Sequence, residues 1–221
     1  MRGIVLHRGD GVNFPALAAD GVRFTVLSAS VGTDGITPHL AERADDARRA
    51  GIAVAVYHDL TAVSVTQALA EADHFRRTLA SLDFSPPWAI CRAESPRLPR
   101  DPARLACMIR AFTERIRGDG FRPMLYTGED VLKILGAPPC ELLLARWSVP
   151  EARALSRNPR IWEYGEGRAG DIPRAILLRG YFSSLPDSGG DFSPWGNIGS
   201  FCPSNRKKSS VICPRKRRYT V

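Results

Sequence analysis

Polar side chains able to do chemistry gather where short apolar segments of this chain end. His58 and Asp59 follow one such segment, and Glu94 follows another. Carboxyl groups at such positions can act as acids, bases or nucleophiles, and an imidazole exchanges protons near neutral pH. Aromatic residues recur beside them and offer flat apolar faces with polar tips. The candidate functional positions at the other segment ends are His7, Ala29-Ser30, Arg92, Tyr126 to Glu129, Trp147, Glu163-Tyr164 and Leu177-Leu178.

Metal and cofactor chemistry has little support in the sequence. The five cysteines include no C-x-x-C pair, and the four histidines lie far from the cysteines and from each other. Neither the G-x-G-x-x-G motif nor the G-x-x-x-x-G-K-[ST] motif occurs, so dinucleotide and P-loop sites lose their support. We expect no metal, no cofactor and reduced thiols. The alternative is that Cys202 and Cys213 close a small loop in an oxidising environment.

The elements that position these residues alternate between strand and helix. Continuous apolar segments predict buried parallel strands, and the segments between them have helical composition and caps. Such a pattern forms an open doubly wound sheet or a barrel, and about eight strands in 180 residues favour a compact α/β, TIM-like (β/α) barrel. Its site would lie at the C-terminal ends of the strands. The predicted strands are 3–7, 23–29, 52–58, 88–93, 121–126, 141–147, 160–164 and 175–182, and the predicted helices are 13–19, 38–50, 66–82 and 101–117.

The C-terminal segment differs from the rest of the chain. Residues 186–221 hold seven basic and two acidic side chains, so most of the net charge of +8 belongs to them. No apolar periodicity continues beyond Phe182, and we expect a barrel over 1–182 and a disordered basic tail over 183–221. The tail is an interaction segment or the product of a shifted reading frame. Nucleic-acid binding is not expected, because the body of the chain is nearly neutral.

Composition and the N-terminus bear on location. No apolar run approaches the ~20 residues of a membrane-spanning helix, and the first ten residues lack the apolar core of a signal peptide. We expect a monomer that is cytoplasmic as encoded, with release by a route other than general secretion as the alternative.

In order and spacing, the segments resemble family-25 glycoside hydrolases, the Chalaropsis-type lysozymes or muramidases, over residues 2–182. The resemblance implies a (β/α) barrel that cleaves the glycan of peptidoglycan. The segments that carry it are Gly3-Ile4, Gly11-Val12-Asn13-Phe14, Asp20 to Phe24, Gly32-Thr33-Asp34, Ala47 to Ile52, Val54 to His58, Glu71 to Phe75, Pro86-Pro87, Arg122 to Gly128, Leu144 to Trp147 and Ile161 to Tyr164.

The family's acidic centre is largely replaced in this chain. The resemblance places an Asp after the first Gly-Ile, an Asp-x-Glu at the end of the fourth strand and an Asp in the last strand. Here Val5 stands at the first position, and the last falls near Leu177. The Asp-x-Glu position reads Arg92-Ala93-Glu94 in the preferred register and Ile90-Cys91-Arg92 in the alternative one. Glycoside hydrolysis normally needs two carboxyl groups, and a guanidinium two residues from Glu94 favours its ionised form.

The aromatic lining is better kept than the acids. By the resemblance, Tyr57, His58, Tyr126, Trp147 and Tyr164 are candidates for substrate binding, with packing in the barrel rim as the alternative. Our first hypothesis is an impaired lysozyme-like barrel that binds peptidoglycan or a related glycan, or serves as a structural module. The second is an active hydrolase that uses Glu94 as its catalytic acid with a relocated partner, for which the candidates are Asp59, Glu129 and Glu163. A third, a nucleic-acid binder acting through its basic tail, would show steep salt dependence.

Overall fold

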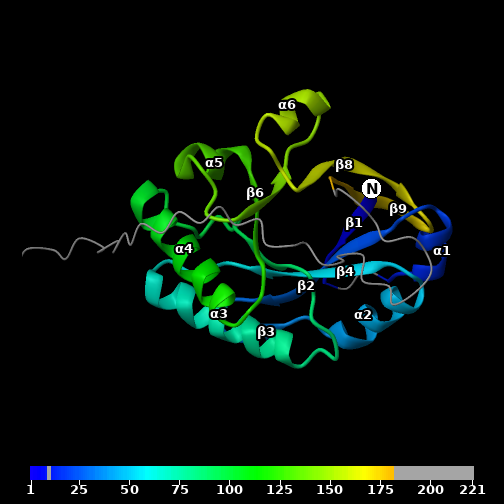
Figure 1. Ribbon diagram of the computed structural model, residues 1–221, viewed down its shortest axis with the longest axis horizontal. Helices are drawn as coiled ribbons and strands as arrows, with labels where there is room; N and C mark the ends of the chain where they lie inside the picture. The colour runs from blue at the N-terminus through cyan, green and yellow to red at the C-terminus, as the bar shows by residue number, and fades with distance from the viewer. Residues whose placement is uncertain (9–10, 182–221) are drawn as a thin grey trace, which may run out of the picture.

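Eight strands close into a barrel in the computed structural model, which describes residues 1–8 and 11–181 (Figure 1). The barrel predicted from the strand pattern is therefore confirmed. A ninth, short strand, β3 (Gly35–Ile36), pairs with the end of β2 outside the ring. The barrel strands are β1 (Arg2–Leu6), β2 (Phe24–Val31), β4 (Ala53–Asp59), β5 (Ala89–Arg92), β6 (Pro123–Gly128), β7 (Glu141–Ala145), β8 (Ile161–Ala169) and β9 (Ile172–Gly180).

Strand direction distinguishes this barrel from a regular (β/α) barrel. Neighbouring strands run parallel from β1 through β2, β4, β5, β6 and β7 to β8, but β9 is antiparallel to both β8 and β1. A tight turn at Gly170, whose φ is +55°, joins β8 to β9 without an intervening helix. The sequence predicted strands over 160–164 and 175–182 only, because polar residues in the hairpin interrupt the apolar pattern.

Six helices cover the ring among the described residues. The four predicted helices are confirmed, with ends that shift by at most two residues. The helices α5 and α6 were not predicted, because each is too short to show an apolar period. The six are α1 (Phe14–Ala19), α2 (Leu40–Arg49), α3 (Val65–Ala80), α4 (Pro102–Gly118), α5 (Glu129–Leu135) and α6 (Glu151–Leu155).

Two apolar layers meet at the strands, because successive side chains of a strand point to opposite faces. One layer lies between the ring and the helices, and the other fills the barrel with residues such as Phe24, Ile90 and Met124. Gly3 faces this inner core, where a Cβ atom would overlap the ring of Phe24. Packing therefore requires a glycine at position 3.

Several sequence predictions fall on residues 182–221, outside the described part. These are the end of the last strand at Phe182, the tail over 183–221, and the loop between Cys202 and Cys213. Burial raises the pKa of the Cys91 thiol, and it raises the pKa of Cys140 to about 12, so neither is a reactive thiolate at neutral pH. In the described ranges no helix is long and apolar enough to cross a membrane, and no three His, Cys, Asp or Glu side chains form a metal-binding group.

Candidate functional site

Arg92 is the centre of a polar cluster at the C-terminal ends of β4, β5 and β6. Its Nη1 donates to Oδ1 of Asp59 at 3.1 Å, and its Nε donates to Oε2 of Glu94 at 3.0 Å. Its Cζ lies 5.6 Å from the ring centre of Tyr57 and 5.3 Å from that of Tyr126, a cation–π geometry. Burial opposes the charge, but Tyr126, Asp59 and Glu94 outweigh it and raise the pKa of Arg92. The guanidinium is therefore permanently charged and held by four neighbours.

This arrangement supports one of the two registers considered for the Asp-x-Glu position. Arg92 ends β5, and its side chain reaches Glu94 as the two-residue spacing predicts. Ile90 lies deeper, in the inner core. Arg92 and Glu94 are therefore the pair at the strand end.

Glu163 is a buried acid at the same end of the barrel. It lies on β8, is 5 % exposed, and accepts a hydrogen bond from Nε1 of Trp147 to Oε1 at 2.6 Å. The hydroxyl of Tyr126 donates to its other oxygen, Oε2. Burial raises the pKa of Glu163 in spite of these two donors. We call Tyr57, Asp59, Arg92, Glu94, Tyr126, Trp147 and Glu163 together the barrel mouth.

The aromatic residues of the barrel mouth differ in their access to solvent. Tyr57 and Tyr126 are each 1 % exposed and meet edge to face, with ring centres 6.1 Å apart. The Tyr57 hydroxyl shares a hydrogen bond of 2.8 Å with Nδ1 of His7. Trp147 is 43 % exposed. The two tyrosines therefore form the floor beneath Arg92, and Trp147 is the ring that a ligand can reach.

Two predicted binding residues lie away from the barrel mouth. His58 follows Tyr57 on β4 and so points to the opposite face, where it is fully buried under α3. Tyr164 packs on the outside of β8, with its ring 5.5 Å from that of Trp162 and 5.7 Å from Cζ of Arg179. The structure thus brings Glu94, Tyr57, Tyr126 and Trp147 together and separates them from His58 and Tyr164. From these positions, the side chains of His58 and Tyr164 do not reach a ligand in the barrel mouth.

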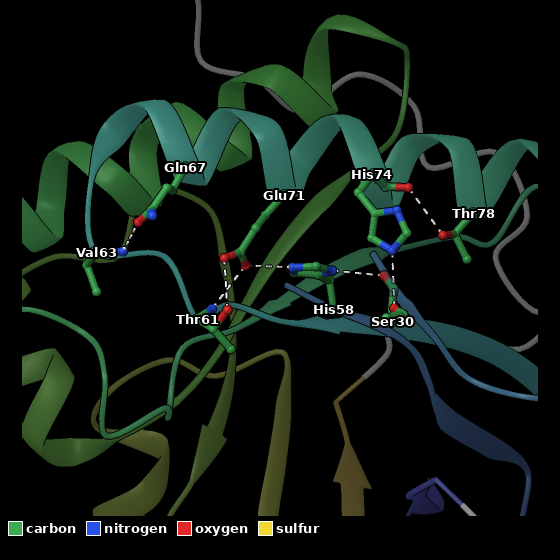
Figure 2. A network of polar contacts seen from close by, with 9 residues as sticks. Ser30, His58, Thr61, Val63, Gln67, Glu71, His74 and Thr78 are labelled. Atoms are coloured by element: carbon green, nitrogen blue, oxygen red, sulfur yellow. Dashed lines mark hydrogen bonds and ion pairs between the residues drawn. The ribbon is translucent and has the colours of Figure 1, made fainter. Parts of the chain in front are cut away.

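His58 belongs to a buried polar network that sequence reasoning missed (Figure 2). Its Nε2 lies 2.9 Å from Oε2 of Glu71, and its Nδ1 lies 2.8 Å from Oγ of Ser30. The Glu71 carboxylate also accepts the backbone N–H and the hydroxyl of Thr61, at 3.0 and 2.9 Å. Burial lowers the pKa of His58, and a neutral ring with its proton on Nε2 satisfies both partners.

The residue types of this network match a hydrolytic triad, but its position does not. The Ser30 hydroxyl is 1 % exposed, so no substrate reaches it. The network instead ties β2, β4, α3 and the loop after β4 together, and Asp59 is the last residue of β4 before that loop. We therefore assign the network a structural role beside the barrel mouth. Its sequence signal is a His within a buried strand, followed thirteen residues later by a Glu on an apolar helix face.

The other acid positions hold no available carboxyl group. Val5 faces the inner core and is buried. On β9, Leu177 points outward to the helical layer. The barrel-facing residues nearest to the last-strand position inferred from the sequence are therefore Ile176 and Leu178. The Arg157 guanidinium, assisted by Arg146, holds the pKa of Glu129 below its usual value, which argues against Glu129 as a proton donor.

Comparisons with known proteins agree with this fold. The structure is similar to a family 25 glycosyl hydrolase from Bacillus anthracis, with a TM-score of 0.68, 15 % identity, and coverage of 82 % of this chain and 89 % of that one. A lysozyme from Streptomyces coelicolor is similar with a TM-score of 0.67 and 19 % identity, over 83 % of this chain and 93 % of that one. The modular autolysin LytC from Streptococcus pneumoniae, in complex with a synthetic peptidoglycan ligand, is similar with a TM-score of 0.68 and 14 % identity. That match covers 80 % of this chain and 46 % of the LytC chain. No curated protein sequence matches this chain.

The sequence profile described as glycosyl hydrolases family 25 matches residues 5–169, which is more than half of the chain. That range contains every residue of the barrel mouth. The chain therefore belongs to family 25 of the glycosyl hydrolases.

Proposed function

We propose that the barrel mouth binds a peptidoglycan-type glycan and does not cleave it. The family and the LytC complex with a synthetic peptidoglycan ligand support the choice of ligand. Trp147 supports the mode of binding, because an exposed indole beside carboxyl and phenol groups suits a sugar, which has an apolar face and a polar rim.

The observation that carries the second half of the proposal is the position of Arg92. Hydrolysis needs one carboxyl group to give a proton and another to act as base or nucleophile on the opposite side of the bond. Here Asp59 and Glu94 both accept N–H bonds from Arg92. Neither carboxylate is therefore an independent acid or base, and Val5 leaves the end of β1 without a carboxyl group.

A second candidate function has one observation in its favour. In an active hydrolase, Glu163 would be the proton donor and Glu94 its partner, because burial raises the pKa of Glu163 and so favours its protonated form. In that case Glu163→Gln and Glu94→Gln would each abolish turnover. Under the proposed function, neither variant nor the wild type releases reducing ends from peptidoglycan.

Replacing Trp147 by alanine tests the binding site. The change removes the accessible ring and is expected to weaken binding about 10-fold or more, as truncation of a buried aromatic contact does. The measurement is calorimetric titration of the protein with soluble peptidoglycan glycan fragments. Tyr164→Ala is the matched control, because that ring packs on the outside of β8, away from the barrel mouth. Equal loss in both variants, or none in Trp147→Ala, would remove the barrel mouth from consideration.

A further inference from the structure

Trp147 lies in a segment that does not fix its ring by itself. It follows the end of β7 by two residues, and the next residue, Ser148, has a φ of +56°. The neighbouring residue is anchored, because the Arg146 N–H donates to the Glu163 carbonyl at 3.0 Å and its own carbonyl accepts the Trp162 indole at 2.8 Å. An exposed indole on such a segment turns about its side-chain bonds unless its single N–H is held.

We propose that Glu163 is a positioning residue of the glycan site, whose side-chain oxygen holds the indole of Trp147 so that the ring face stays open to a sugar. The inference rests on the proposed function of the barrel mouth. Oε1 takes the Trp147 N–H at 2.6 Å, and Oε2 takes the Tyr126 hydroxyl. Glu163 thereby ties the one accessible ring of the barrel mouth to its buried floor.

Positioning by Glu163 depends on an acceptor atom and not on charge. The groups that face Glu163 are Arg92 and Glu94 at the end of β5, Tyr126 on β6 and Trp147 after β7. A protonated carboxyl group still accepts the indole N–H through one oxygen. A glutamine also does so, while its NH₂ group donates to the Tyr126 hydroxyl. Glu163→Gln therefore preserves the positioning of the Trp147 ring. If Glu163 were a proton donor in catalysis, glutamine could not replace it.

Substitutions at Glu163 separate these roles. In titrations with soluble peptidoglycan glycan fragments, Glu163→Gln is expected to bind within about 2-fold of the wild type and Glu163→Leu about 10-fold more weakly. Trp147→Phe keeps a ring but has no N–H, so adding Glu163→Leu to it should cause no further loss. Wild-type binding by Glu163→Leu, equal losses in the leucine and glutamine variants, or additive losses in the double variant would each overturn the proposal.

A ligand-free measurement distinguishes failure of this proposal from failure of the proposed function. The emission of Trp147 is obtained as the difference between each protein and the same protein carrying Trp147→Phe. Acrylamide should quench that emission more strongly in Glu163→Leu than in the wild type or Glu163→Gln, because the untethered ring becomes more accessible. Equal quenching in all three would contradict positioning even if glycan binds. Increased quenching without any glycan binding would uphold the tether and reject the proposed function.

Discussion

The triple variant Val5→Asp/Arg92→Asp/Ile176→Asp is expected to release reducing ends from peptidoglycan at least about 100-fold faster than the double variant Val5→Asp/Ile176→Asp. Positioned acid–base groups typically contribute 10²–10⁴-fold each. The variant Val5→Asp/Ile176→Asp keeps Arg92, which still binds Glu94. Adding Arg92→Asp removes the cation and supplies a carboxyl group in one step. The measurement is the initial rate of reducing-end release from purified peptidoglycan.

The choice of Ile176 follows from the structure. Ile176 pairs with Val5 across β1 and β9 and faces the barrel, whereas Leu177 faces the helices. A triple variant with Leu177→Asp in place of Ile176→Asp is the matched control and should gain less. If the folded triple variant with Ile176→Asp is no faster than the double variant, then Arg92 does not block hydrolysis.

Replacing Glu71 by alanine is expected to lower the free energy of unfolding by about 3 kcal/mol or more, because it leaves several donors without their acceptor and each such donor costs about 1–3 kcal/mol. The buried His58 ring would lose its acceptor, and so would the backbone N–H and hydroxyl of the half-buried Thr61. Urea unfolding measures the change. Gln67→Ala, one turn earlier on α3 and exposed, is the control. A loss for Glu71→Ala as small as that of the control would show that the network is not structural.

The sequence predicted the barrel because continuous apolar strands and capped helices are local features that packing preserves. The sequence does not show which face of the sheet each strand residue occupies. Tyr57 and His58, for example, are neighbours, and both residue types occur in ligand-binding sites. Only ring closure decides that Tyr57 lies beneath Arg92 and His58 beneath α3. In the same way, the outward direction of Leu177 depends on its pairing with β1.

The candidate site was predicted in part. The spacing of Arg92 and Glu94 indicated their ion pair, because residues two apart share a strand face. The second bridge of Arg92, to Asp59, joins residues 33 positions apart, and no local pattern indicates it. Glu163 was one of three spare acids, and what distinguishes it from Glu129 is its surroundings. Glu163 is bound by neutral donors in the barrel, whereas Glu129 is bound by two arginines outside it.

The measurement that tests the central claim most directly is the chain length of glycan recovered from its complex with the wild-type protein. Soluble peptidoglycan strands are incubated with the protein at saturation, released, and compared by mass spectrometry with strands kept in buffer. We predict that bound strands are recovered with unchanged length and no new reducing ends. Strands that shorten with time in the wild type, and remain intact with Glu94→Gln, would contradict the claim and establish an active hydrolase.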